Sequence, residues 1–429
     1  MSHSNGFRHR TVQKRMRLAG ALALLAATVL AGCASVPEGS RSSSPKPSLS
    51  PAASPIPSAL PAASRSPTDQ PVATTVNCIH PYNSTHGVAL VSYAGAIGVL
   101  DVSNGLKPFL LCWFSPAQGA AFDQAANQVV FWAGNHLGAI DLAAGKVTMT
   151  DTLPATPWAG AFSHDGSLFA YRTGDDSTGT GMSTHVYHRG VDRVLYTQAT
   201  LGGHGGPNWG PVDRLEFSAD DQYLLDFYEF RPTSGPDTLL VYQTGGLLVP
   251  SVPADSLRRL SVNQAEPGAW SPKGSALFYF VPPTGSTPSK VLWWEPSGVI
   301  ELASGVGSWS WPEVKPQGSE LYYNEWQSTD RNDQCGGLPH LWRIELGNGK
   351  RSQISDAVAS HPVFVTPSFV WMNEEKPTQC GIGGESAPDG VILGYDLANG
   401  STTHVDMSLT VPGVGAPQPN SGWIVDVWL

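Results

Sequence analysis

Basic side chains are scarce in most of this chain. Residues 76–429 contain 17 Lys and Arg against 33 Asp and Glu, which gives this region a formal charge of −16. Proteins that bind nucleic acids or anionic surfaces do so mainly through clustered Lys and Arg. The composition therefore argues against nucleic acid as a partner, although solubility alone would also explain the acidity.

Cysteine is rare, and the common catalytic motifs are missing. None of the five Cys residues forms a Cys-x-x-Cys pair, which argues against zinc and thioredoxin-type chemistry. There is no Gly-x-Ser-x-Gly elbow, no His-Glu-x-x-His helix, no phosphate-binding loop and no calcium loop. His185 and His188 are expected to point to one side of a strand, but they lack a third metal ligand. No metal and no cofactor are therefore predicted.

The N-terminus is an exception to the shortage of basic residues. Five Lys and Arg lie between Arg8 and Arg17, and an apolar stretch, Leu18–Leu30, follows them. That stretch is too short to span a bilayer as a mature helix. It ends in Leu30–Cys33, with the sequence Leu-Ala-Gly-Cys, which resembles the lipobox of bacterial lipoproteins. The resemblance implies cleavage before Cys33, acylation of Cys33, and anchoring to the cell membrane on its extracytoplasmic face. The alternative is an ordinary signal peptide in which Cys33 is incidental.

A Ser/Pro/Ala-rich segment separates Cys33 from the rest of the chain. Pro, Ser and Ala occupy 27 of the 42 positions from 34 to 75, with no apolar periodicity. Such a segment cannot bury enough surface to offset its ordering entropy. We therefore predict a signal peptide over 1–32, a disordered tether over 33–75 and one folded region over 76–429. An extended Pro-rich tether of this length reaches on the order of 130 Å.

Two turn sequences repeat through the folded region. The first has an acid, a hydrophobe, two small or polar residues and a Gly, and it recurs at Asp101–Gly105, Asp141–Gly145, Glu345–Gly349 and Asp396–Gly400. The second recurs out of phase with the first, at Phe162–Ser167, Phe217–Gln222, Trp270–Ser275 and Val314–Ser319. Two hairpin turns that alternate every 40 to 55 residues or so are typical of four-stranded propeller blades.

The repeats predict an all-β fold, a β-propeller of seven four-stranded blades. The expected blades are 86–112, 113–155, 157–199, 209–254, 266–304, 308–356 and 360–407. The first blade lacks an inner strand, and Trp423–Trp428 offers one, so we expect the C-terminal strand to close the ring. Six or eight blades remain open, because residues 76–83 and 411–420 are ambiguous.

The two turn types place most of the long connections on one face. We label the strands of a blade A to D from the axis outward, so the repeating turns are A–B and C–D. The long insertions are then B–C or D–A, and we call their side of the ring the long-loop face. Loops on one side of a rigid scaffold commonly bind partners. Cys335 and Cys380 fall in adjacent B–C loops and are predicted to pair. Cys112, at the end of a D strand, is predicted to pair with Cys78.

The long connections also supply candidates for ligand binding, namely Trp158, His204, Trp209, Asp175 and Asp176. Indoles near blade entries are suited to stacking on sugars, or else they pack between blades. His204 lies among four glycines, where an imidazole can act as acid, base or ligand, or is incidental in a surface loop. The two acids offer oxygen ligands, but such pairs in loops are commonly just solvated.

Phe162–Tyr171 and Trp270–Ser275 resemble the repeat of TolB-like propellers, in which a Phe-Ser-Pro-Asp-Gly core precedes a strand ending in Tyr. The resemblance covers several blades and implies an extracytoplasmic propeller suited to protein or ligand contacts. TolB itself has an α/β domain before the propeller. In this chain the lipobox and tether stand in that place, so the partner role of TolB does not carry over.

The leading interpretation is a monomeric, non-enzymatic lipoprotein that binds an envelope or extracellular protein, peptide or glycan through its long-loop face. The alternative is a carbohydrate- or peptide-active enzyme with its site at the channel mouth, where His204, Trp209, Asp175 and Asp176 would act. A third interpretation is a spacer or sensor without a specific ligand.

Overall fold

The computed structural model separates the chain into two units, Met1–Arg65 and Ser66–Leu429. It describes residues 74–78, 87–93, 95–102, 109–175, 180–197, 214–228, 238–263, 265, 268–314, 318–326, 339–358, 360–376, 387–405 and 423–428. All of them belong to the second unit. Within these ranges no helix is long and apolar enough to cross a bilayer.

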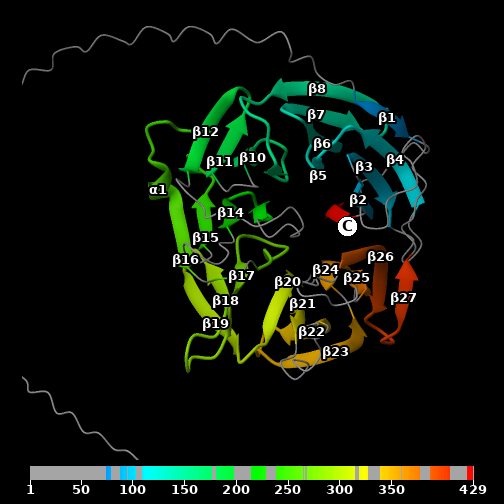
Figure 1. Cartoon of the computed structure of the whole chain (residues 1–429), viewed down its shortest axis with the longest axis vertical. Helices are drawn as coiled ribbons and strands as arrows, with labels where there is room; N and C mark the ends of the chain where they lie inside the picture. Colours follow the sequence, from blue (N-terminus) through cyan, green and yellow to red (C-terminus); the bar gives the residue numbers. More distant parts are fainter. Residues whose placement is uncertain are drawn as a thin grey trace, which may run out of the picture. The chain divides into compact units, whose positions relative to one another are not determined.

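The second unit is a seven-bladed β-propeller, as the repeats predict (Figure 1). Five blades have four antiparallel strands each, which follow one another from the axis outward. Blade 2 consists of β5 (Gly119–Asp123), β6 (Gln128–Ala133), β7 (His136–Asp141) and β8 (Lys146–Thr152). Blade 3 consists of β9 (Ala159–Phe162), β10 (Phe169–Asp175), β11 (Thr180–His188) and β12 (Val191–Thr197). Blade 4 consists of β13 (Arg214–Phe217), β14 (Tyr223–Tyr228), β15 (Thr238–Gln243) and β16 (Arg258–Asn263). Blade 6 consists of β20 (Ser308–Val314), β21 (Glu320–Trp326), β22 (Pro339–Glu345) and β23 (Arg351–Val358). Blade 7 consists of β24 (Ser360–Val365), β25 (Phe369–Lys376), β26 (Ala387–Asp396) and β27 (Thr402–Val405).

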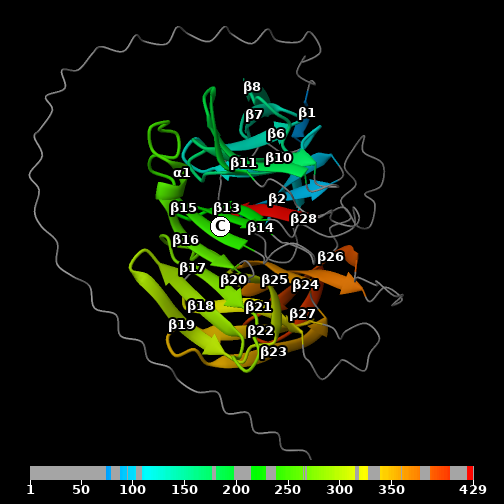
Figure 2. The ribbon, with the colours of Figure 1, turned by 60° about the vertical axis from the view of Figure 1, so that its left-hand side comes forward.

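Blade 1 contains both ends of the second unit. Its strands, from the axis outward, are β28 (Trp423–Trp428), β2 (Val88–Tyr93), β3 (Ala96–Asp101), β4 (Phe109–Ser115) and β1 (Thr75–Cys78). β28 pairs antiparallel with β2, and Figure 2 shows the two side by side. The predicted closure by the C-terminal strand is therefore confirmed. The fifth strand, β1, was not predicted. It adds to the outer edge of β4.

Blade 5 departs from the pattern at the axis. It has three strands, β17 (Leu277–Val281), β18 (Lys290–Glu295) and β19 (Gly298–Ser304), and a single bridge from Trp270 to Leu277 stands for the innermost strand. Gly268 explains how this short segment fits. A Cβ at that position would lie 1.0 Å from the carbonyl oxygen of Phe278. Only Gly allows such a close backbone approach.

The C–D connection of blade 4 is an exception to the prediction that these turns are tight. It contains the helix α1 (Ala254–Leu257), so this part of the sequence expectation was wrong. The guanidinium of Arg193 in β12 holds the connection to blade 3 by donating to the carbonyls of Gly246, Leu247, Val249 and Val252. The predicted C–D turns at Asp141–Gly145, Glu345–Gly349 and Asp396–Gly400 are tight, and Gly145, Gly349 and Gly400 have the positive φ that these turns require. Most of the predicted turn Asp101–Gly105 lies outside the described residues.

The apolar core is divided into layers between neighbouring blades. Phe169 and Tyr171 of β10 pack against Trp132 of blade 2, whereas Ala170 between them packs against Leu224 of blade 4. Successive strand residues point to opposite faces, so each blade contributes to two layers. Burying one such large side chain stabilises the fold by about 1.5–3 kcal/mol. The innermost strands β28, β5, β9 and β13 follow one another around the axis.

Candidate functional site

The long-loop face is described only in part. The A–B turn and the C–D connection of blade 4 share one face, since Thr244 donates through Oγ1 to the Asp221 carbonyl (2.6 Å) and through its N–H to that of Gln222 (2.9 Å). The B–C and D–A connections leave the opposite ends of the strands. Several of these connections, together with the predicted site residues Cys33, Asp176, His204, Trp209, Cys335 and Cys380, lie outside the described residues. Asp175 is the last residue of β10, at the start of one such connection.

Cys78 and Cys112 form a disulfide that joins β1 to β4. Cys112 lies in the middle of β4 rather than at its end, where the sequence had placed it, because the strand continues to Ser115. The bond therefore fastens the additional outer strand to blade 1. It lies on the outer side of the blade and away from the axis.

Trp158 lies at the entry to blade 3, as the sequence predicts. Its backbone N–H donates to the carbonyl of Arg172 at 3.1 Å, and the Arg172 guanidinium lies 5.8 Å from the indole centroid. The residue is half-buried. A cation over an indole face is favourable, so packing on Arg172 holds the half-buried Trp158 in place.

Arg172 forms a buried ion pair between blades 3 and 4. Its Nη2 lies 2.5 Å from Oδ1 of Asp226 in β14 and donates to the carbonyl of Phe227, and both charged side chains are completely buried. The second carboxylate oxygen of Asp226 has no hydrogen-bond partner in the described part of the chain. Such a pair fixes its geometry strongly, because removing one partner leaves a buried charge uncompensated. It forms a rigid base for Trp158 near the end of β10.

A similar polar group supports blade 6. Arg351 lies 2.5 Å from Oε2 of Glu325, and Tyr323 donates to the same oxygen at 2.8 Å. The other oxygen of Glu325 accepts the N–H of Gly307 at 2.9 Å, and Arg351 donates to the Gly305 carbonyl at 3.0 Å. These bonds hold the D–A connection that enters blade 6. On the long-loop face, ionic groups therefore anchor the ends of the connections to the sheets.

Blade 3 carries a relay of hydrogen bonds across three strands. Thr173 Oγ1 lies 3.0 Å from Nε2 of His185, and His185 Nδ1 lies 3.0 Å from Oδ2 of Asp192. Tyr171 donates to the other oxygen of Asp192 at 2.7 Å and stacks on the imidazole at 4.7 Å. Burial raises the pKa of Tyr171 well above its ordinary value, and Asp192 adds to this effect, so the phenol stays a donor.

The order of atoms in this relay is that of a hydroxyl, an imidazole and a carboxylate in acid–base catalysis. The same atoms also tie β10, β11 and β12 together. His188 does not belong to the relay. It lies three positions from His185 in β11 and so faces the other side of the sheet, where its ring contacts the Ser167 carbonyl. The expectation that the two histidines share a side was wrong.

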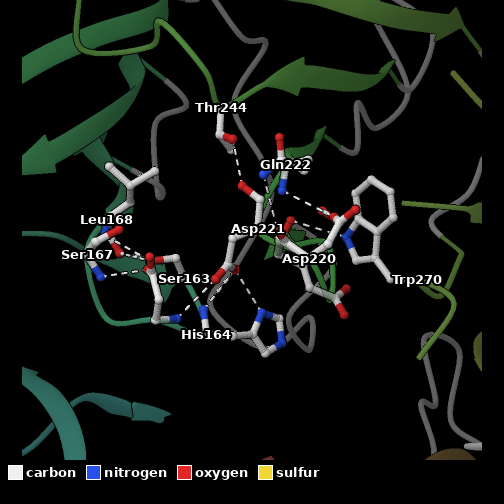
Figure 3. Close-up of polar contacts among 12 residues, drawn as sticks. Ser163, His164, Ser167, Leu168, Asp220, Asp221, Gln222, Thr244 and Trp270 are labelled. Carbon is white, nitrogen blue, oxygen red and sulfur yellow. Dashed lines mark hydrogen bonds and ion pairs between the residues drawn. The ribbon is translucent and has the colours of Figure 1, made fainter. Parts of the chain in front are cut away.

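The repeated A–B turns are explained by their own hydrogen bonds (Figure 3). Ser163 donates to Asp165 at 2.7 Å and accepts the N–H of Leu168 at 2.8 Å. Ser218 and Asp220 form the same bond one blade further on, at 2.7 Å. Burial acts to raise the pKa of Asp165, but hydrogen bonds from Ser167 and Ser163 outweigh it and the pKa is lowered. The Ser-x-Asp pattern therefore builds the turns.

Neighbouring A–B turns are also linked to one another. Asp221 accepts the backbone N–H of His164 at 2.8 Å, its ring Nδ1 at 2.9 Å and the N–H of Asp165 at 3.0 Å (Figure 3). Ser275 of blade 5 donates to Asp220 at 2.6 Å. These contacts join blades 3, 4 and 5 along the face opposite the long loops. In the described ranges, no group of three or more His, Cys, Asp or Glu is arranged to hold a metal.

The chain matches no protein-family model and no curated protein sequence. Among solved structures, TolB from Acinetobacter baumannii matches at 14% identity and a TM-score of 0.36, over 62% of this chain and 62% of that chain. A putative TolB from Agrobacterium tumefaciens is 13% identical, with a TM-score of 0.36, over 75% of this chain and 89% of that chain. The tricorn protease matches at 11% identity and a TM-score of 0.46, over 79% of this chain and 35% of that chain.

These similarities concern the fold alone. The propeller that the resemblance to TolB-like proteins implies is confirmed by the seven sheets of this chain. The chain spans less than two thirds of the length of the A. baumannii TolB structure. Identities this low say nothing about a shared partner or reaction.

The sequence did not single out Arg172 or Asp226. A signal was present, because each is a charged residue inside an apolar strand, Phe169–Arg172 and Leu224–Phe227, of consecutive blades. Lone charges in buried strands are seldom left without a partner. Opposite charges at matching places in neighbouring blades are therefore worth testing as a pair.

Proposed function

We propose that this protein is a lipid-anchored, extracytoplasmic propeller that binds an envelope or extracellular protein, peptide or glycan through its long-loop face. One observation carries the proposal, namely the contrast between the two faces. Hydrogen-bonded turns link blades 3, 4 and 5 on one face, whereas on the other the long connections start from strands fixed by Arg172–Asp226 and Glu325–Arg351. Loops that start from rigid strands can present a defined surface.

The anchor is proposed from the sequence of Leu30–Cys33. Replacing Cys33→Ser is expected to move the protein from the membrane fraction to the soluble fraction and to remove the mass of the acyl chains from its N-terminal peptide. Membrane association that survives this change would contradict the anchor without affecting the proposed binding face.

Replacing the connections that contain Cys335 and Cys380 tests the binding face. We expect a chain in which 328–337 and 378–385 are each replaced by Asn-Gly to lose its partner in cross-linked envelopes while it keeps its cooperative unfolding. Ala144→Arg, in the exposed C–D turn of blade 2, is the matched control and should change neither partner binding nor cooperative unfolding. Unchanged partner binding after both loop replacements would reject the proposed face.

A second candidate function, hydrolysis of a polysaccharide or peptide, is favoured by the Thr173–His185–Asp192 relay. In this function His185 would take the hydroxyl proton and Asp192 would orient the imidazole. Turnover of a glycan or peptide that is lost in both His185→Ala and Asp192→Asn would support it. Absence of turnover across a broad panel would mean that the relay only holds the strands of blade 3 together.

A further inference from the structure

The outer strand of blade 5 differs from its counterparts in blades 2, 3, 4 and 6. Outer strands in blades 2, 3, 4 and 6 each contain Lys or Arg, which protects a sheet edge from pairing with other chains. β19 has the sequence Gly-Val-Ile-Glu-Leu-Ala-Ser and contains no Lys, Arg or Pro. It lies at the rim of its sheet, with β18 on its inner side (Figures 1 and 2). Within the described ranges no strand pairs with its outer edge.

Two consecutive residues of β19 have exposed apolar side chains. Val299 is 48% exposed and Ile300 is 56% exposed, the highest value among the large apolar side chains of the described residues. Because consecutive strand residues point to opposite faces, this strand offers apolar surface on both sides of its free edge. Trp294 and Trp293 lie opposite them in β18, where Trp294 is buried and Trp293 packs against the core, so the exposed apolar surface is confined to β19.

The free part of the edge is four residues long. From Leu302 onward the edge is covered by blade 6, since a Cβ at Gly349 would lie 2.2 Å from the Leu302 carbonyl oxygen. The segment 298–301 remains. Blade 1 shows that this ring accepts an added strand of that length, because the four residues of β1 pair with the outer strand β4.

Charge indicates what kind of chain would pair there. Glu301 lies at one end of the free edge and pairs with Lys290 at 2.7 Å. Glu295 of β18 lies opposite Gly298 at the other end and accepts a hydrogen bond from Ser297. The full chain carries a net charge of −10, so a second copy would be repelled. A segment that alternates β-branched and cationic side chains would cover one of Val299 and Ile300 with its β-branched face, and its cationic face would complement the acidic surface.

We propose that residues 298–301 of β19 are a docking edge for an extended, cationic and β-branched segment of a partner protein, which adds to blade 5 as a further strand. This surface lies on the outer rim and is independent of the long-loop face.

The test uses the purified full chain and a fluorescein-labelled peptide of sequence Lys-Val-Thr-Val-Lys-Val. We expect saturable binding by fluorescence anisotropy, and slower amide exchange in 298–301. The double variant Val299→Lys/Ile300→Lys should weaken binding by about tenfold or more, because it removes the apolar contacts and protects the edge. A copy of the peptide methylated at every backbone nitrogen should not bind.

The matched control is Val191→Lys/Val194→Lys in β12, where both side chains are 46% exposed. It changes the net charge equally and should alter binding less than about twofold. Equal loss in both variants, binding of the methylated peptide, or no saturation up to about 1 mM would overturn the proposal. A wild-type dimer in sedimentation that Val299→Lys/Ile300→Lys disperses would also overturn it, since the occupant would then be a second copy.

Discussion

At the scale of single residues, the protein places its charges where they hold strands together. Arg172 and Asp226 are completely buried and face each other across two blades, whereas Lys290 and Glu301 form an ion pair of similar length on the surface. Distance alone does not distinguish the two pairs. Burial does, because water screens the Lys290–Glu301 pair but does not reach the Arg172–Asp226 pair.

Replacing Arg172→Met is expected to lower the free energy of unfolding by about 3–5 kcal/mol, because it leaves Asp226 charged and buried. The double variant Arg172→Met/Asp226→Leu should recover most of that loss. Chemical denaturation measures both, with Lys290→Met as the surface control, which should cost less than about 1 kcal/mol. A double variant as unstable as the single one would show that the charge is not the cause.

Ser163→Ala and Ser218→Ala should each cost about 1–2 kcal/mol at neutral pH, because each removes a buried hydroxyl that bonds both an Asp and a backbone N–H. The pKa of Asp165 and of Asp220 is lowered in the folded protein. Their stabilisation is therefore present above the ordinary carboxyl pKa and is lost as the pH falls through the lowered value.

The difference in the free energy of unfolding between each Ser→Ala variant and the parent should accordingly become smaller below about pH 3.8. Urea denaturation across pH 2.5–7 measures this difference, with the exposed Ser297→Ala as the control. If this difference stayed constant or grew in acid, the serines would stabilise the fold only through their hydrogen bonds with backbone N–H groups.

At the scale of strands, blades 1 and 5 are the most informative, because they do not have four strands. β1 lies directly after the Ser/Pro/Ala-rich region, and its four residues are too few to show an alternation. The missing inner strand of blade 5 depends on the close backbone contact of Gly268 with Phe278 in β17, which the neighbouring turn sequence Trp270–Ser275 does not reveal. Repeated turns therefore predict the hairpins well. They do not predict strands that lie outside a hairpin, and these depend on tertiary contacts.

The disulfide is expected to hold β1 stably against β4. Replacing Cys78→Ser and Cys112→Ser opens a loop of 34 residues, which the chain-entropy account values at about 3–4 kcal/mol. Hydrogen exchange is expected to show fast exchange in 74–78 and little change in β3. If 74–78 stayed protected in the double variant, pairing with β4 alone would be sufficient to hold this strand.

At the scale of the whole molecule, the ring is closed by strands from its two ends. The turn repeats and the spare segment Trp423–Trp428 were enough to predict that closure. The site was less predictable. Trp158 was found from its position before a turn, whereas its contact with Arg172 and the pairing with Asp226 depend on how two blades face each other.

Ending the chain at Gly422 removes β28 and exposes the edge of β2. We expect the apparent melting temperature to fall by about 10 °C or more, with a less cooperative transition, because blade 1 loses its innermost ladder. Differential scanning calorimetry measures this, and a synthetic peptide of residues 423–429 added in trans should restore part of the loss. An unchanged transition would mean that the ring does not depend on this strand.

The central claim is that partners contact the long-loop face. Site-specific photo-cross-linking in intact cells tests it most directly, with a photoreactive residue at exposed Thr284 in the B–C connection of blade 5 or at exposed Ala144 on the opposite face. The account predicts a discrete protein or glycan adduct from position 284 and none from position 144. Adducts from 144 with none from 284 would contradict it.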